Sequence, residues 1–314
     1  MEKEEYKRII MEYEGQEHGP LFCVISGIHG NEKAGIQGLK LVSKMLEVEP
    51  ITNPNFFFRG KLIGLTGNLK AINNNVRFID KDLNRIWSQE RIELIKKKPT
   101  SDLCHEEREQ LQIIEIIDRK THEYNPTALY ILDLHTTSSG GGIFTIPNEE
   151  PESLRIAQSL HAPVIVGMLE GITGTTLHYF NNRLSKKFPI TSVTFEAGQH
   201  NDPLSINRCI AAIITFLRKI GCVAQKDVAN IHDDILINYA ANLPSLSKLI
   251  HKHQILDNDG FIMKPGYKNF QPIQKGERLA HDRSGDIIAP SDGLILMPLY
   301  QSQGEEGFYI IEEI

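Results

Sequence analysis

The sequence predicts an α/β fold, in which a mixed β-sheet is flanked by helices, with a smaller all-β domain at its C-terminal end. The first observation is that short apolar runs of strand length alternate with amphipathic segments of helical periodicity up to about residue 220. The second is a change of composition after about residue 224. From there on, Gly, Pro and Asp separate short apolar pairs, as in short antiparallel strands and turns. We therefore expect two domains, residues 1–224 and 225–314.

The strands expected in the first domain are apolar runs bounded by glycine or by polar residues. The run "LFCVISG" is typical, because it is apolar over most of its length and ends in glycine, as a strand buried on both faces does. The runs that we interpret as strands cover residues 21–27, 60–68, 128–135, 141–147, 162–168 and 190–198.

Three segments between or after these strands have the periodicity of helices that bury one face. Apolar residues recur near helical spacing in residues 31–46 and again in residues 103–122. The segment 207–221 is largely apolar and ends at Gly221, a residue type that often terminates helices. Together with the strands, these segments predict a largely parallel or mixed sheet with helices on both faces.

Composition and charge exclude several functional classes. The 314 residues carry a net charge of −6, so we expect no nucleic-acid partner bound through a general basic surface. The N-terminus lacks the apolar segment of a signal peptide and no run reaches membrane-spanning length, so we expect no membrane association. The four cysteines show no CxxC spacing, which favours reduced thiols and a cytoplasmic location.

Three potential metal ligands follow two of the expected strands. His29 and Glu32 come just after the first strand, and His135 ends the strand 128–135. The carboxyl ends of strands in open α/β sheets converge at ligand sites. Two His and one Glu are an established ligand set for catalytic zinc, which leaves one position for water. We therefore expect one zinc ion per chain at His29, Glu32 and His135, although the His29–Glu32 spacing alone is common in unrelated sequences.

Two carboxylates accompany these residues. Asp133 precedes His135 by two residues, so both point to the same side of a strand. There Asp133 would accept the imidazole N–H or form an ordinary salt bridge. Glu196 ends an apolar strand, where the burial of its charge needs a reason. It is either a general base close to the metal or a Glu turned outwards, and the strand alone leaves both interpretations open.

The segment "VRFIDKDLNRIW" contributes Arg77, Asn84 and Arg85. An amide followed by a planar guanidinium suits a carboxylate held by several hydrogen bonds. A solvated helix start would account for the same residues. Burying several guanidinium groups together is unfavourable unless anions accompany them. We therefore expect a small carboxylate-bearing substrate to complete this cluster.

Four motifs, taken together, carry a family resemblance. "GIHGNE", "RFIDKDLNR", "DLHTTSSGGG" and "TFEAG" follow one another in this order. In this order and at these separations they resemble the aspartoacylase and succinylglutamate desuccinylase family, which is related to the zinc carboxypeptidases. The resemblance covers roughly residues 20–220, and the C-terminal part more diffusely. It implies that residues 1–224 form a zinc-hydrolase catalytic domain with a zinc carboxypeptidase-like fold.

The resemblance also implies a role for each residue that matches a motif. The metal ligands would be His29, Glu32 and His135, and Glu196 would be the general acid/base. Arg77 would polarise the scissile acyl carbonyl and stabilise its oxyanion.

Asn84 and Arg85 would hold the carboxylate of the amino-acid half of the substrate. Family members also use an Arg ahead of a "KYP"-like segment, and "NNRLSKKFP" offers Arg183 at the matching distance. A substrate-binding Tyr from the C-terminal domain of aspartoacylase has no clear counterpart, since neither Tyr300 nor Tyr309 aligns well.

The function expected from the residues and the resemblance is a zinc-dependent hydrolase that removes an acyl group from a small N-acyl amino acid or related amide. Two alternatives stay open: a zinc carboxypeptidase acting on short peptides, and a non-catalytic metal-dependent binding protein. A biotinyl or lipoyl carrier is disfavoured, because "AHDRSGD" has no lysine where a carrier hairpin presents one. Association into homo-oligomers is also left open.

Overall fold

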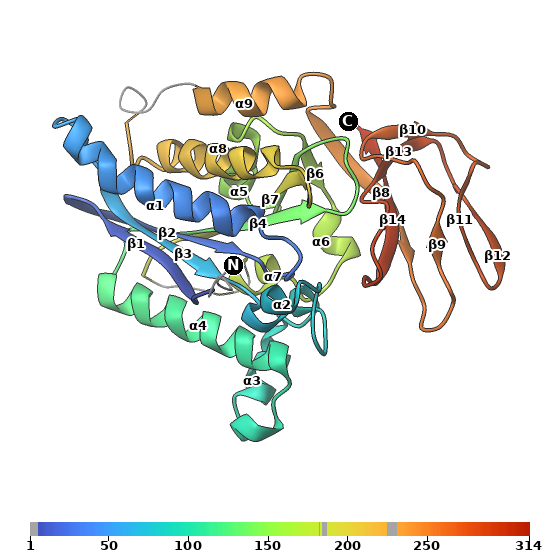
Figure 1. Cartoon of the computed structure of the whole chain (residues 1–314), viewed down its shortest axis with the longest axis horizontal. Coiled ribbons are helices and arrows are strands. Elements are labelled where there is room, and N and C mark those ends of the chain that lie inside the picture. The colour runs from blue at the N-terminus through green and yellow to red at the C-terminus, as the bar shows by residue number, and fades with distance from the viewer. Residues whose placement is uncertain (1–5, 182, 184–186, 225–230) are drawn as a thin grey trace, which may run out of the picture.

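The computed structural model describes residues 6–181, 183, 187–224 and 231–314. Its main element is an 11-stranded mixed sheet with the strand order β1-β3-β2-β4-β7-β5-β6-β8-β14-β13-β10, and a three-stranded sheet has the order β12-β11-β9. Helices cover both faces of the N-terminal part of the main sheet (Figure 1). The predicted fold class, an α/β mixed sheet flanked by helices with a smaller β unit at the C-terminal end, is confirmed.

The bounds of the elements follow. The strands are β1 (Ile9–Glu14), β2 (Glu17–Ser26), β3 (Arg59–Thr66), β4 (Leu129–Thr137), β5 (Phe144–Pro147), β6 (Val164–Val166), β7 (Ile190–Gln199), β8 (Leu246–Gln254), β9 (Ile262–Met263), β10 (Gln271–Ile273), β11 (Arg278–Asp282), β12 (Gly285–Ile288), β13 (Gly293–Leu296) and β14 (Glu306–Glu313). The α-helices are α1 (Ala34–Thr52), α2 (Leu69–Asn74), α3 (Gln89–Ile95), α4 (His105–Tyr124), α5 (Pro151–Ser159), α6 (Met168–Gly171), α7 (Thr176–Asn181), α8 (Leu204–Lys219) and α9 (Ile231–Ala240). Short 3-10 helices lie at Leu83–Arg85 and Thr100–Asp102.

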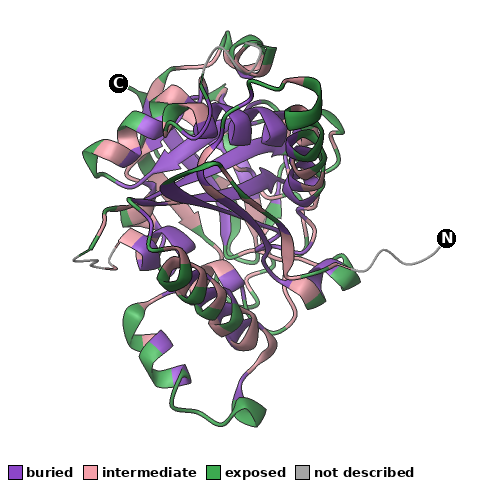
Figure 2. Cartoon of the chain, turned by 90° about the vertical axis from the view of Figure 1, so that its left-hand side faces the viewer, coloured by how far each residue is buried: buried purple, intermediate pink, exposed green. Residues whose placement is uncertain are grey.

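The central strands of the main sheet are parallel and buried on both faces. Strand β2 pairs with β3 and β4, and β4 pairs with β7, all in parallel. Along β2, Phe22 and Val24 belong to the core that includes α1 and α8, whereas Cys23 and Ile25 belong to the core that includes α4. Figure 2 shows these strands as buried ribbons between helices whose outer faces are exposed. Burial on both faces is the physical reason for the continuous apolar runs in the sequence.

The predicted helices and strands of the first 220 residues are present, with bounds that differ by a few residues. Helix α8 ends at Lys219, and Gly221 follows with a φ of +75°. This left-handed conformation is disfavoured for residues that carry a Cβ, so the glycine ends the helix as predicted. Elements that the sequence pattern did not indicate are the edge strand β1, the short helices α2, α3 and α5–α7, and α9.

The C-terminal residues extend the main sheet. Strand β8 pairs in parallel with β6, and β14, β13 and β10 continue the sheet with antiparallel pairs. Strands β11 and β12 form an antiparallel hairpin, in agreement with the short antiparallel strands and turns expected after residue 224. The boundary expected at 224/225 adjoins residues 225–230, which lie outside the described residues, and the division into two domains stays a prediction.

No helix in the described parts of the chain is long and apolar enough to cross a membrane.

Candidate active site

The candidate site lies at the carboxyl ends of β2, β4 and β7. After β2 the chain forms β3, which is the neighbour of β2 on one side. Strands β4 and β7 follow on the other side of β2. The ends of β2 and β4 therefore border the crevice where the strand order changes direction, which is where open α/β sheets bind ligands. His29 follows β2, and His135 lies near the end of β4. A cavity of about 80 Å³ opens at this place.

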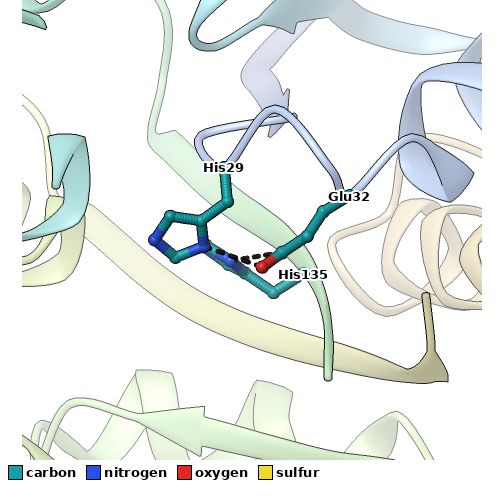
Figure 3. Close-up of side chains that lie close together, drawn as sticks. All are labelled: His29, Glu32 and His135. Atoms are coloured by element: carbon teal, nitrogen blue, oxygen red, sulfur yellow. Dashed lines mark hydrogen bonds and ion pairs between the residues drawn. The ribbon is translucent and has the colours of Figure 1, made fainter. Parts of the chain in front are cut away.

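The three expected metal ligands come together there. His29 Nδ1 lies 2.8 Å from Glu32 Oε1, and His135 Nδ1 lies 2.9 Å from Glu32 Oε2. One donor atom from each residue lies within 4.8 Å of the other two. Figure 3 shows the side chains of all three converging from the loop after β2 and from β4. The donor set, two imidazole nitrogens and one carboxylate, fits a zinc ion with one position left for water.

A second carboxylate faces the outer nitrogen of each imidazole. His29 Nε2 lies 3.0 Å from Asp82 Oδ1, and His135 Nε2 lies 3.0 Å from Asp133 Oδ2. Because these carboxylates favour a proton on Nε2, they leave the Nδ1 lone pair of each ring for a metal. Asp133 thus lies at ion-pair distance from His135, although His135 Nε2 forms no hydrogen bond to a described residue. Asp82 was not expected in this role, although it lies inside the "RFIDKDLNR" motif.

The loop that carries His29 and Glu32 is held close to α2. A Cβ on Gly30 would lie 2.1 Å from the backbone carbonyl carbon of Ala71, so only glycine fits at position 30. The Gly30 N–H donates to the Arg77 carbonyl at 3.0 Å, and the Glu32 N–H donates to the His29 carbonyl at 3.1 Å. These contacts fix the ligand pair against the segment that supplies Arg77.

The charges of the site are balanced within the protein. Burial alone would raise the pKa of Glu32, but the imidazoles of His29 and His135 hold it well below its usual range. Burial alone would lower the pKa of His135, but Asp133 and Glu32 raise it well above its usual range. Attraction between opposite charges therefore exceeds the cost of burial at these ligands. A bound cation would take the place of the protons that join these groups.

Glu196 lies beside His135, because the two residues are partners in the β4–β7 ladder. Its side chain is buried and lines the cavity. Burial raises the pKa of Glu196 to about 8; Glu32 and Asp133 also raise it, whereas His135 and Arg77 act in the opposite direction. Its Oε2 has no hydrogen-bond partner among the described residues. A buried carboxyl with a free oxygen and a pKa near neutrality suits proton transfer.

Arg77 lies on a loop that α4 holds in place. Glu106 of α4 is buried, and its carboxylate accepts the backbone N–H groups of Ile79 at 2.8 Å and Asp80 at 3.1 Å. Arg77 directs Nε and Nη2 at Asp82 Oδ2, at 3.0 and 2.9 Å, and its Nη1 lies 3.8 Å from Glu32 Oε1. The guanidinium of Arg77 is thereby held next to the three expected metal ligands.

Asn84 and Arg85, which follow Arg77 in the sequence, line the same cavity. The Asn84 N–H donates to Asp82 Oδ1 at 2.8 Å, and Asn84 Oδ1 accepts the Thr176 N–H at 3.1 Å. Arg85 forms a two-point ion pair with Glu306 of β14, with Nε–Oε1 at 3.1 Å and Nη2–Oε2 at 2.6 Å. The anion next to Arg85 is thus a residue of the protein, which the sequence did not indicate.

Arg183 is not brought to the cavity. Its guanidinium pairs with Asp118 of α4 and lies 5.9 Å from the ring centre of Tyr179. Its neighbours 182 and 184–186 lie outside the described residues. The structure therefore unites the ligands, Glu196, Arg77, Asn84 and Arg85, but not Arg183.

The C-terminal part of the chain forms one wall of the cavity. The lining residues from this part are Met297, Leu299, Gln301, Gly304, Glu306 and Tyr309. Tyr309 is buried and its hydroxyl has no hydrogen-bond partner among the described residues. Sequence reasoning considered Tyr309 without assigning it, and it missed Glu306. The only local signal for Glu306 is a charged residue at the start of an apolar strand.

The chain matches the family model described as the succinylglutamate desuccinylase/aspartoacylase catalytic domain over residues 18–219. It is 27% identical to a succinylglutamate desuccinylase of a Shewanella species over 286 residues, which cover 87% of this chain and 76% of that protein. It is 32% identical to a probable aspartoacylase of Acaryochloris marina over 149 residues, which cover 45% of this chain and 44% of that protein. The matched part of the chain spans less than half the length of the latter relative.

A solved structure shares the fold. The chain superposes on a succinylglutamate desuccinylase/aspartoacylase structure from Rhodobacter sphaeroides with a TM-score of 0.64 at 15% identity. The superposition covers 95% of this chain and 86% of that chain. The similarity therefore includes the C-terminal strands as well as the region of the family model.

Proposed function

The chain belongs to the succinylglutamate desuccinylase/aspartoacylase family, and from this premise we propose that it is a zinc-dependent hydrolase that removes the acyl group from a small N-acyl amino acid. The observation that carries the proposal is the convergence of two imidazoles and a carboxylate beside the free oxygen of Glu196. A binding protein would need the ligands but not a buried carboxyl of raised pKa next to them.

His29, Glu32 and His135 would hold the metal, with Asp82 and Asp133 orienting the two imidazoles. When bound there, zinc would act as a Lewis acid and would acidify the attacking water. These residues are buried and come from two adjacent strand ends, and one donor atom of each lies within 4.8 Å of the other two, which supports a site for one small cation.

Glu196 would take a proton from the attacking water and deliver it to the departing amine nitrogen. The amide bond breaks as the water oxygen bonds to the acyl carbon, so the products are a carboxylic acid and a free amine. The pKa of Glu196, which burial raises to about 8 in the metal-free protein, lies near the pH at which one group can serve first as base and then as acid. A nearby cation would lower this pKa and favour the ionised form.

Arg77 would donate to the acyl oxygen as negative charge develops on it. Its Nη1 is the guanidinium nitrogen that is not engaged with Asp82, and Arg77 lines the cavity. A fixed guanidinium that needs no reorganisation is effective in this role. The loop contacts of Glu106 maintain its position.

Asn84 and Arg85 lie where the amino-acid half of the substrate would be held. We propose Asn84 as a direct donor, since its Nδ2 has no hydrogen bond to a described residue. Arg85 would act together with Glu306. A role for Arg183 in binding substrate has no support from its position next to Asp118.

The wall of C-terminal residues favours small substrates over peptides. A carboxypeptidase needs a groove for the peptide that precedes the cleaved bond, whereas this cavity is narrow and is bordered by the segment from Met297 to Tyr309. The test is turnover of zinc-loaded protein with a panel of N-acetyl, N-succinyl and N-formyl amino acids beside blocked dipeptides. Cleavage of the N-acyl amino acids is expected. Cleavage of the dipeptides alone would overturn the proposal.

A further inference from the structure

The backbone that carries Arg77 belongs to neither a helix nor a strand. Residues 77–82 form a loop, so their N–H groups lack the partners that regular structure supplies. Glu106 accepts the N–H groups of residues 79–81 at 2.8 to 3.2 Å. No backbone carbonyl among the described residues accepts the N–H groups of Arg77 and Phe78. These two groups need an acceptor from elsewhere in the chain.

Gln303 supplies that acceptor. Its Oε1 accepts the Arg77 N–H at 3.0 Å and, more distantly, the Phe78 N–H at 3.5 Å. Its Nε2 donates to the Phe78 carbonyl at 3.2 Å. One side-chain amide thus accepts from and donates to the same short stretch of backbone, much as a neighbouring strand would. Such a contact fixes both the position and the orientation of the stretch.

Gln303 reaches the loop from the C-terminal part of the chain, 226 positions away from Arg77. The segment that carries it, between β13 and β14, is itself held in place. Gln301 Oε1 accepts Asn31 Nδ2 at 2.7 Å, and the Tyr300 N–H donates to Ser138 Oγ at 3.0 Å. Gln303 is not among the described residues that line the cavity. Its influence on a bound substrate must therefore pass through the loop.

The Arg77 side chain is anchored at its far end as well. Nε and Nη2 bind Asp82 Oδ2, and Nη1 lies 3.8 Å from Glu32 Oε1. An ion pair at the tip leaves a long side chain free to follow its backbone, so the place of Nη1 depends on where the Cα of Arg77 is held. Misplacement of a reacting contact by about 1 Å is enough to cost a large factor in rate.

From these contacts we propose that Gln303 is a positioning residue, which fixes the backbone of Arg77 so that the guanidinium meets the acyl oxygen as charge develops on it. The inference rests on the proposed function, in which Arg77 donates to that oxygen. Because a contact of this kind strengthens in the transition state, loss of Gln303 should lower kcat and change KM less.

A purely structural role is the alternative, in which Gln303 only joins the C-terminal part to the rest of the protein. The matched control is Gln271→Ala. Gln271 of β10 is half-buried like Gln303, and its Oε1 accepts the Lys268 N–H at 3.2 Å away from the cavity. Gln303→Ala and Gln271→Ala therefore remove the same kind of contact, but only the first removes it from the loop of Arg77.

The first measurement follows the guanidinium without any substrate. The NMR signal of the Arg77 Nε–H group, identified by its absence in Arg77→Lys, reports the contact with Asp82. In Gln303→Ala this signal should shift, and its exchange with water should accelerate by about tenfold. In Gln271→Ala the signal should stay where it is in the wild type. Gln303→Asn, which is one methylene group too short to span the loop, replaces Gln303→Ala if the latter does not fold.

The second measurement is steady-state kinetics of the zinc-loaded proteins with the N-acyl amino acid that the wild type cleaves fastest. Gln303→Ala should lower kcat by about tenfold and change KM by less than about threefold, with zinc content and unfolding midpoint close to the wild type. In the Arg77→Lys background the same substitution should cost no more than about twofold, because the guanidinium that Gln303 positions is absent. Gln271→Ala should leave both constants within about twofold of the wild type.

An unchanged Arg77 signal in a folded Gln303 variant overturns the proposal, whether or not the protein turns over substrate. An equal loss of kcat in the wild-type and Arg77→Lys backgrounds also overturns it, since Gln303 would then act independently of Arg77. Absence of turnover in the wild type, with the expected change of the Arg77 signal in Gln303→Ala, contradicts the proposed function and leaves the contact between Gln303 and Arg77 supported.

Discussion

The two ends of the cavity are built in different ways. At the metal end, His29, Glu32 and His135 come from the ends of neighbouring parallel strands of one sheet. At the other end, Arg85 meets Glu306 across 221 positions of sequence, through the C-terminal strand β14. The first end depends on the topology of the parallel sheet, whereas the second depends on how the C-terminal strands extend it.

This difference separates the groups proposed for the chemistry from the Arg85–Glu306 pair. The proposed metal ligands and the proposed base come from the ends of β2, β4 and β7, and the proposed oxyanion donor Arg77 comes from the loop after α2. At the far end, Glu306 of the C-terminal part lines the cavity and pairs with Arg85. Substitutions at the two ends should therefore affect different quantities.

Loss of a metal ligand should have the largest effect. In His29→Ala and in His135→Ala one of three ligands is missing, so zinc content should fall from about one per chain to a small fraction, and turnover should be lost. Metal analysis of the purified proteins checks this, with His251→Ala in β8 as a control that keeps its zinc. Full zinc content in both ligand variants would remove these residues from the site.

Glu196→Gln should separate chemistry from metal binding. The amide has the same shape but cannot accept the proton of the attacking water, so kcat should fall by about 10²-fold or more while zinc content and unfolding midpoint stay close to the wild type. Single-turnover kinetics of the zinc-loaded variant make the comparison. A kcat near that of the wild type would show that Glu196 is not the base.

Arg77→Lys should reduce kcat by about tenfold to a hundredfold with a smaller change in KM, because its contact strengthens as the oxyanion forms. An ammonium cannot bind Asp82 through two nitrogens and reach the acyl oxygen as well. Steady-state kinetics test this, with Arg91→Lys on α3 as the matched control. A change confined to KM would instead place Arg77 among groups that bind substrate and transition state equally.

The smallest effect concerns the stability of the metal-free protein. Burial raises the pKa of Glu196 to about 8, so between the usual glutamate pKa of about 4.3 and this value the folded state holds a proton that the unfolded state has lost. The free energy of unfolding should therefore decline as pH rises through this window, and less so in Glu196→Gln. Urea unfolding of both metal-free proteins at pH 5.5 and 8.5 provides the measurement. Equal pH dependence in the two proteins would contradict the raised pKa.

Much of the fold was readable in the sequence because both faces of the central strands are buried. Residues 21–27 and 128–135 are continuous apolar runs for that reason, and they correspond to β2 and β4. Strand β1 was not recognised, because an edge strand needs only one buried face, and Met11 is its only fully buried residue. Short helices such as α6 have too few residues to establish a period.

In the candidate site too, some residues could be predicted from local sequence and others could not. His29, Glu32, His135 and Glu196 were predicted as a group because the carboxyl ends of parallel strands meet at one edge, so a local position predicts spatial proximity. Asp82 lay within a recognised motif, but its contact with His29 depends on how the loop before the 3-10 helix at Leu83–Arg85 folds against β2.

The sequence by itself therefore determined the α/β alternation and the set of groups that converge at the strand ends. Only the tertiary structure decided which charges are already neutralised: Arg85 by Glu306, Arg77 by Asp82, and Arg183 by Asp118. The physical reason is that a strand position follows from local periodicity, whereas an ion pair follows from the distance between side chains. That distance depends on strand pairings, such as β6 with β8 and β8 with β14, that join remote segments of the chain.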